Sequence, residues 1–132
     1  LMMTLANVRD FLKTIINAEH FYIGRLDNKQ DKSVGVYTLK TSGESLRGVG
    51  TELSYDVIAV SLLIHWNNNA NETEVCARTL YNKLRTIKNV TINNSKVYLI
   101  QLLTPEPIDV GTDNEVYERV IEMKIFFERK ED

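Results

Sequence analysis

The stretch from His65 to Leu84, HWNNNANETEVCARTLYNKL, contains residue types that can do chemistry. A histidine, the only tryptophan, several asparagines, two glutamates and the only cysteine follow one another closely. Histidine, cysteine and carboxylates at such spacing can ligate a metal ion or assemble a nucleophile with its base. The alternative interpretation is that a strand ends here and a helix begins, with the asparagines as turn and cap residues.

The expected geometry of this stretch separates its histidine from its cysteine. His65 lies on the mixed face of a predicted strand, whereas Cys76 shares the apolar side of a predicted helix with Leu80 and Leu84, so the two need not meet. A structural zinc site usually has four ligands in closely spaced pairs, and the only other histidine is His20. A buried cysteine is most often a small apolar residue. We therefore expect no metal site and no cofactor.

Nucleophilic catalysis has no clear signature in this chain. No serine lies in a Gly-x-Ser-x-Gly elbow, and Cys76 lies inside the predicted helix instead of at its start, where a thiol pKa is lowered. The glycines of Ser42 to Thr51 lack the trailing Lys-Ser/Thr of a phosphate-binding loop. These absences predict that the protein is not an enzyme.

An acidic segment, TPEPIDVGTDNE, follows the last predicted hairpin and is expected to be a long structureless loop. Its carboxylates can be read as the acid and base of a hydrolase or as calcium ligands, although the spacing of an EF-hand is absent. The simpler interpretation is an exposed, solvated loop or a protein interface. We take as candidate interface residues Glu106, Asp109, Asp113 and Glu115.

A basic set on and after the predicted second helix complements this acidic loop. Such residues normally form a solvated helix face and favour the negative end of the helix dipole. Their functional interpretation is a patch for an acidic neighbour, and an acidic loop with a basic helix end suits head-to-tail self-association into a ring. The candidate basic interface residues are Arg78, Lys83, Arg85, Lys88 and Lys96.

Length and composition set the broad class. The chain has 132 residues, 43% hydrophobic and 26% charged, which predicts one globular domain spanning residues 1–132. No apolar run approaches the roughly 20 residues that cross a bilayer, and no secretory signal is expected. The lone cysteine fits a reducing compartment. A net charge of −2 argues against nucleic-acid binding and favours protein partners or small ligands.

The N-terminal part of the chain predicts a helix followed by a hairpin. Apolar residues recur at three- and four-residue steps from Thr4 to about Glu19, which indicates an amphipathic helix with Thr4 as its N-cap. The segment from His20 to Lys40 has two runs rich in Tyr, Ile and Val, separated by the polar stretch Asp27 to Lys32. This pattern predicts a β-hairpin.

The central part predicts a loop, a strand and a helix. The glycine-rich segment Ser42 to Thr51 fits no period and is expected to be a loop. Between Tyr55 and Trp66 both alternating faces are largely apolar, which indicates a strand inside the sheet. Asn71 and Glu74 have the spacing of a capping box at the start of the second helix.

The C-terminal part predicts a hairpin and a long strand. Asn93 and Asn94 supply residues that tolerate positive φ at the turn of a hairpin in VTINNSKVYLIQLL. The segment VYERVIEMKIFFER alternates apolar and charged residues and predicts a long strand with one dry face and one wet face. The predicted fold is α+β, with two helices packed on one face of a mostly antiparallel sheet in the order α-β-β-β-α-β-β-β.

Three segments resemble the minor capsid or tail-completion proteins of long-tailed bacteriophages and Gram-positive prophages. The most specific parts are the patterns IGxxDxxxxxSVGVY, HWNxNxxET and PEPIDVGTD, and no catalytic motif is among them. Together the segments cover about two thirds of the chain. They are AEHFYIGRLDNKQDKSVGVYTLK (18–40), YDVIAVSLLIHWNNNANETEVCARTLYNKL (55–84) and VYLIQLLTPEPIDVGTDNEVYERVIEMKIFFER (97–129).

The resemblance implies a tail-terminator-like fold and a structural role in the virion. Such subunits are thought to close the end of the tail tube, commonly as a ring of six, before the head connector joins. The implied partners are other copies of the chain, the tail tube protein and a head-completion or connector protein, and we expect no specific nucleic acid and no membrane. The implied location is the virion, at the tail end or head-to-tail junction, after a period in the host cytoplasm.

Two other interpretations stay open. The first is a small adaptor or regulatory domain that binds another protein through an open sheet edge. The second, with less support, is a small hydrolase that uses the carboxylates of the acidic loop.

Overall fold

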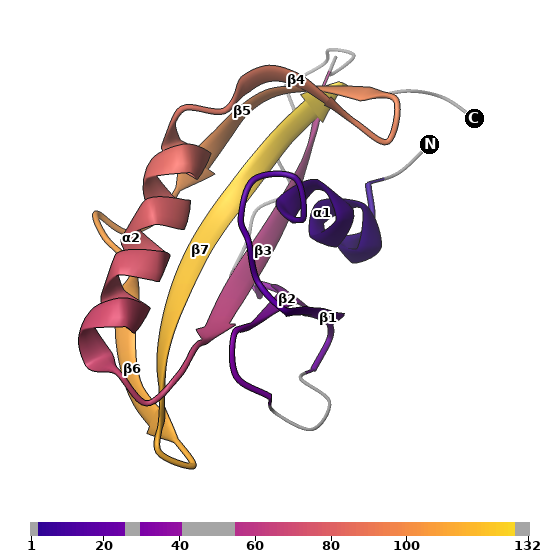
Figure 1. The fold of residues 1–132 in the computed structure, drawn as a ribbon. Helices are drawn as coiled ribbons and strands as arrows, with labels where there is room; N and C mark the ends of the chain where they lie inside the picture. The colour runs from indigo at the N-terminus through magenta and orange to yellow at the C-terminus, as the bar shows by residue number, and fades with distance from the viewer. Residues whose placement is uncertain (1–2, 26–29, 41–54, 129–132) are drawn as a thin grey trace.

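The computed structural model describes residues 3–25, 30–40 and 55–128 (Figure 1). The expected glycine-rich loop at 42–51, residues 1 and 2, and part of the predicted turn at 27–32 lie outside the described residues. The described elements are α1 (Leu5–Leu12), β1 (His20–Ile23), β2 (Ser33–Thr38), β3 (Tyr55–His65), α2 (Ala70–Arg85), β4 (Lys88–Ile92), β5 (Ser95–Leu102), β6 (Ile108–Asp113) and β7 (Val116–Glu128).

Strand β7 is the centre of one sheet with the order β1-β2-β3-β7-β5-β4. On one side, β7 pairs antiparallel with β3 over the whole length of β3, from Tyr55 opposite Glu128 to His65 opposite Glu118. On the other side it pairs first with β6, over Val116 to Val120, and then with β5, over Met123 to Phe127. Two strands in succession therefore occupy one side of β7.

The hydrophobic core lies between the sheet and the two helices, which cover the same face (Figure 1). Strand alternation turns Ile121, Met123, Ile125 and Phe127 of β7 toward this core, as the sequence predicts. Helix α2 packs over β7 and β5, and α1 packs over β1 and β2. The other core residues from these neighbours include Val8, Leu12, Val34, Val36, Val60, Leu62, Ile64, Ala77, Leu80 and Leu84.

The predicted fold class was wrong in its strand order and in the type of sheet. The observed order is α-β-β-β-α-β-β-β-β, because the acidic segment expected to be structureless contains β6. Strand β5 reaches only Met123, so the N-terminal part of β7 needs another partner for its backbone groups. A tight turn with positive φ at Asn114 (53°) and Glu115 (67°) lets the chain pair there.

The segment from His20 to Lys40 does not form the predicted hairpin. β1 and β2 pair in parallel, with His20 opposite Ser33 and Ile23 opposite Val36, which makes the sheet mixed. Backbone bonds from Glu19 N to Lys32 O (2.9 Å) and from Lys32 N to Trp66 O (2.6 Å) hold the start of β2 beside the start of β1 and the end of β3.

Helix α1 is shorter than the sequence predicted, ending at Leu12 instead of near Glu19. Its predicted N-cap is confirmed, because Thr4 accepts a hydrogen bond from the Asn7 backbone in a capping box. The three β-branched residues that follow Lys13 disfavour further helix. Thr14 instead donates its hydroxyl to the Phe11 carbonyl at 2.6 Å, which closes the last turn.

Of the other local predictions, the β4–β5 turn is confirmed and the start of α2 is wrong by two residues. The β4–β5 turn has positive φ at Asn93 (52°) and Asn94 (61°), as predicted. The N-cap of α2 is Asn69, which accepts from Glu72 N at 3.0 Å, so the predicted cap at Asn71 was two residues too late. The described residues include no helix that is both long and apolar enough to span a membrane.

The cap position gives a direct test of this helix start. Asn69→Ala removes the side-chain acceptor for Glu72 N, so we expect it to lower the free energy of unfolding by about 1 kcal/mol. Asn71→Ala, a substitution of the same residue type two positions later, should change it by less than about 0.5 kcal/mol. Urea unfolding of both variants measures the difference, and equal losses would contradict the assignment.

Candidate functional site

A buried histidine lies at the C-terminal end of β3, in a row that crosses three strands. His65 is the register partner of Ser33 in β2 and of Glu118 in β7. Its Nδ1 lies 2.7 Å from Glu118 Oε2, and the His65 side chain is 0% exposed against 12% for Glu118. The row therefore presents serine, histidine and carboxylate side by side, the residue types of a hydrolytic triad.

This row is not arranged for nucleophilic attack. The Ser33 hydroxyl donates to the Gln30 carbonyl at 2.6 Å, and Ser33 is fully buried like His65. An attacking hydroxyl needs both a base and an approach for the substrate. Within the row a side-chain contact joins His65 to Glu118, and the Ser33 hydroxyl is bonded to the Gln30 carbonyl instead.

A second carboxylate joins this row from β6. Asp113 lies opposite Val116 across the two-residue β6–β7 turn. Val116 and Glu118 are two residues apart on one strand, so Asp113 lies on the same face of the sheet as Glu118. One ligand atom from each of His65, Asp113 and Glu118 lies within 4.8 Å of the others. We call these three residues the His65 cluster.

Sequence reasoning considered His65 with Cys76 and missed this cluster. It assigned Glu118 to the wet face of the last strand and Asp113 to a structureless loop, so neither was compared with His65. The missing signal was the turn itself: Asn114 and Glu115 separate two runs that can pair as strands. With β6 recognised, strand alternation puts both carboxylates on the face of His65.

Cys76 packs against the core from α2, as the sequence predicted. Its side chain is partly buried, and this burial raises the pKa of the thiol from 9.0 to about 11. A raised pKa keeps the thiol neutral and poorly nucleophilic near pH 7. Cys76 is therefore a packing residue in this structure.

One member of each set predicted from the sequence, Arg78 of the basic set and Glu106 of the acidic set, meet within one subunit. Arg78 on α2 donates to Glu74 at 2.9 Å and to Glu106 at 3.3 Å. Arg119 of β7, which the sequence analysis did not single out, lies 4.0 Å from Glu74 and 3.7 Å from Asp109. These ion pairs tie the helix to the β5–β6 connection and to β6.

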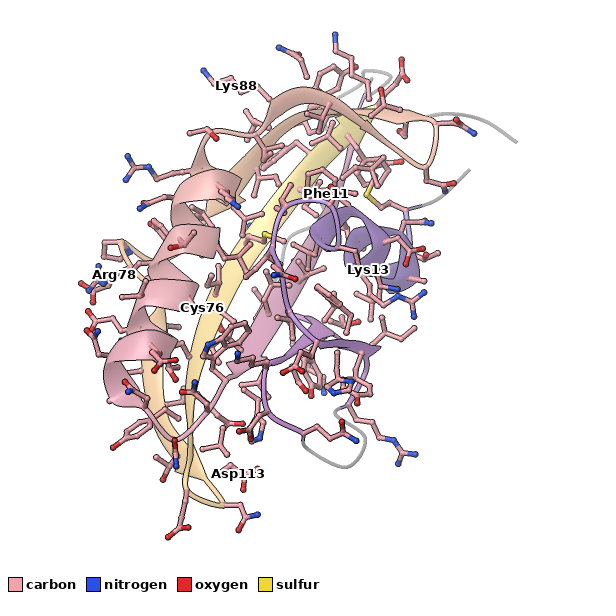
Figure 2. All side chains as sticks on the ribbon, viewed as in Figure 1. Phe11, Lys13, Cys76, Arg78, Lys88 and Asp113 are labelled. Atoms are coloured by element: carbon pink, nitrogen blue, oxygen red, sulfur yellow. The ribbon has the colours of Figure 1, made fainter. Side chains whose placement is uncertain are left out.

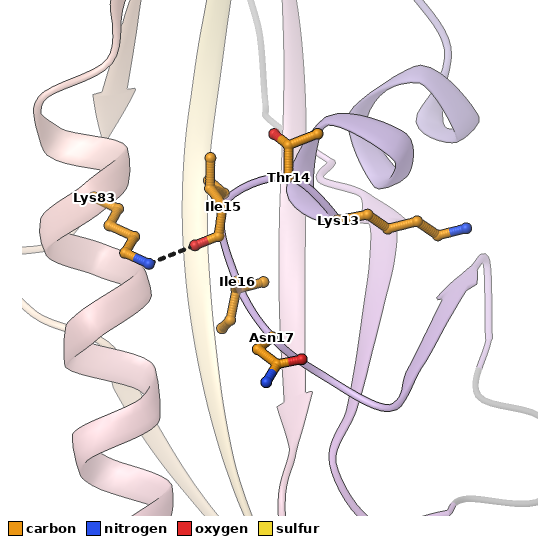
Figure 3. A pocket seen from close by; sticks show the side chains of 6 residues that line it. All are labelled: Lys13, Thr14, Ile15, Ile16, Asn17 and Lys83. Atoms are coloured by element: carbon orange, nitrogen blue, oxygen red, sulfur yellow. Dashed lines mark hydrogen bonds between the residues drawn. The ribbon is translucent and has the colours of Figure 1, made fainter.

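The remaining candidate residues are dispersed. Lys83 donates to the Ile15 carbonyl at 2.7 Å beside a shallow pocket of about 300 Å³ (Figure 3). Lys96 stacks over the Tyr98 ring at 5.6 Å. Figure 2 shows Lys88 and Asp113 at opposite ends of the molecule, with Arg78 on the outer side of α2. Arg85 and Glu115 are exposed, at the end of α2 and in the β6–β7 turn.

The pockets along α1 do not involve the acidic segment. The first lies beside Lys83, and a second, of about 460 Å³, lies between α1 and the β4–β5 turn. Neither is lined by any of the four candidate carboxylates.

Comparison with protein-family models and with curated proteins finds no match to this chain. The resemblance to tail-completion proteins stays a prediction.

The burial of Cys76 predicts slow thiol chemistry. Below pH 9 the folded chain carries about 100-fold less thiolate than the unfolded chain, since the thiol pKa is about 11 in the fold and ordinarily 9.0. Labelling with a chromogenic disulfide at pH 8 should therefore be about 100-fold slower in buffer than in denaturant. Labelling at equal rates would show that the thiol is accessible.

The same pKa predicts the pH dependence of stability. Burial raises the pKa of Cys76 in the folded state to about 11. The contribution of the neutral thiol to the free energy of unfolding is therefore fully present below about pH 9 and is lost as the pH rises through about 11. Cys76→Ser should lose this part of the alkaline dependence, measured by urea unfolding between pH 8 and pH 11.

Because Glu118 is hydrogen-bonded to His65, we expect its replacement to lower the stability of the protein more than replacement of another glutamate of β7. Glu118→Ala removes a hydrogen-bond partner of the fully buried His65 and should lower the free energy of unfolding by about 1–3 kcal/mol. Glu122→Ala, a half-buried carboxylate on the same face of the same strand, is the matched control and should cost less. Equal costs would show that the His65 contact contributes nothing.

Proposed function

We propose that this chain is a structural subunit of a long-tailed phage particle that closes the tail tube and takes part in joining the tail to the head. It acts by assembling into a ring, without catalysis. The supporting observation is the distribution of exposed apolar side chains: four of the six large ones among the described residues lie in residues 99–117. They are Leu99 (45% exposed), Leu103 (36%), Val110 (48%) and Tyr117 (36%).

This segment, residues 99–117, also contains a strand edge suited to assembly. Within the described part of the chain β6 pairs only with β7, so its outer edge has no strand partner. Exposed strand edges and exposed apolar side chains both favour association with another chain. A subunit that works inside a ring requires such surfaces, whereas an isolated monomer normally avoids them.

The charge distribution supports a contact between two different surfaces. The β6–β7 turn carries the exposed Glu115, while Arg85 at the C-terminal end of α2 and Lys88 at the start of β4 are also exposed. Contacts that join two different surfaces by a rotation close into rings. One ring face then fits the last ring of tail tube protein, and the other receives the head-completion or connector protein.

A small adaptor domain is the alternative that the same β6 edge supports. Such a domain would accept a strand from an unrelated protein, because the unpaired backbone groups of an edge bind extended peptides of many sequences. The two functions differ in their assembly: a tail-closing subunit is needed to make particles, and an adaptor is not.

Deleting the gene from its phage or prophage tests the proposal. We expect an induced lysate to contain full heads separate from tails, or tails of uncontrolled length, by electron microscopy. The wild-type gene supplied in trans should restore intact particles. Intact particles at normal yield without the gene would contradict the proposed function and favour the adaptor.

Two single substitutions identify the surface. Val110→Arg puts a charge on the β6 edge, and we expect it to fail in complementation while the purified chain keeps its circular dichroism spectrum. Val75→Arg is the matched control, because Val75 is 54% exposed on α2 and lies outside residues 99–117. Equal complementation by both variants would exclude β6 as an assembly surface.

A further inference from the structure

We propose that the His65 cluster is a binding site for a divalent transition-metal cation, with zinc the best match. His65, Asp113 and Glu118 each offer one ligand atom, and these atoms lie within 4.8 Å of one another. The inference is independent of the proposed role in phage assembly, because it rests only on the donor atoms and their positions.

The donor set indicates the class of metal. Imidazole nitrogen favours zinc and its first-row neighbours, whereas magnesium and calcium favour sites made of oxygen alone. The cluster combines one imidazole with two carboxylates, so it offers nitrogen as well as negative charge to offset that of the cation. Three protein ligands leave a coordination position for water.

The ligand positions are set by three strands before any ion arrives. His65 ends β3, Glu118 is its register partner in β7, and Asp113 ends β6 beside the two-residue turn. Ligands at about 2.1 Å from a common ion lie at most about 4.2 Å apart. The three side chains therefore need only small rearrangements, in which His65 Nδ1 and Glu118 Oε2, now 2.7 Å apart, separate to admit the ion. A preformed site of this kind binds without ordering a loop.

An approach for the ion lies on the β6 side of the cluster. Gly111 is the register partner of Glu118, and no heavy atom lies within 4 Å of the position that a side chain on Gly111 would take. Glu118 (12% exposed) and Asp113 are partly exposed, whereas His65 is fully buried. A hydrated ion therefore reaches the carboxylates first and the imidazole last.

Metal binding would replace the hydrogen bond between His65 and Glu118 as the connection between these side chains. An ion held by all three ligands would cross-link β3, β6 and β7 at the end of the sheet where the β6–β7 hairpin projects. The expected consequence is a more stable chain and a more rigid hairpin.

Calorimetric titration of the untagged full chain with zinc chloride tests this inference. We expect one zinc ion per chain and a rise in melting temperature with zinc. Asp113→Asn and Glu118→Gln each remove a ligand charge, and each should weaken binding by more than the roughly 10- to 100-fold cost of losing an outer-shell partner. Magnesium should bind far more weakly than zinc.

Two control variants separate this site from other zinc ligands. Glu115→Gln removes a carboxylate from the same turn without touching the cluster, and Cys76→Ser removes the thiol, so both should bind zinc as tightly as the wild type. Circular dichroism establishes that each variant is folded, and Asp113→Asn decides the question if Glu118→Gln unfolds. The inference is overturned by absent zinc binding, or by undiminished binding to folded Asp113→Asn.

Discussion

The pairing of β7 on both sides is the constraint on which the rest of the structure depends. Because β3 covers one side over its full length, every residue of β7 between Glu118 and Glu128 has its facing direction set by a partner. Alternation then sends Ile121, Met123 and Ile125 to the helices and the intervening residues to the opposite face. Both the core and the charged clusters follow from this register.

The long elements whose apolar residues recur at a regular spacing could be predicted from the sequence, and the short elements could not. β3, β7 and the β4–β5 turn were predicted because long alternation and paired asparagines are local signals. β6 has no such signal, since Ile108–Asp113 contains a glycine and two aspartates that disfavour strands in isolation. It is a strand because β7 offers it unpaired backbone groups.

Other errors have the same origin in tertiary context. The apolar residues Ile15 and Ile16 fit the helical period of α1, yet they pack against the core from the turn after it. β1 and β2 are separated by a polar stretch typical of a hairpin, but the start of β2 lies beside the start of β1 and the strands pair in parallel. Hydrophobic spacing records which residues are buried and does not record the path between them.

The candidate site shows the same limit for charges. Composition identified the acidic and basic residues, but the pairing of Arg78 with Glu106 joins positions 28 residues apart. That pairing depends on how α2 docks, with the Tyr81 hydroxyl donating to the Thr104 carbonyl at 2.7 Å. No local sequence pattern predicts how α2 packs on the sheet, so the sequence could not show which acidic residue pairs with which basic residue.

Register on β7 also explains why the two halves of the molecule differ in chemistry. Glu118 and Arg119 are neighbours in sequence but face opposite sides of the sheet, one toward His65 and the other toward Glu74 and Asp109. The β6–β7 hairpin is thus held by polar and charged contacts on both faces, whereas the C-terminal half of β7 is held by the apolar core. Ion pairs respond to salt, pH and bound ions far more than apolar packing does. The contacts that hold the β6–β7 hairpin are therefore more sensitive to salt or a bound ion than those that hold the C-terminal half of β7.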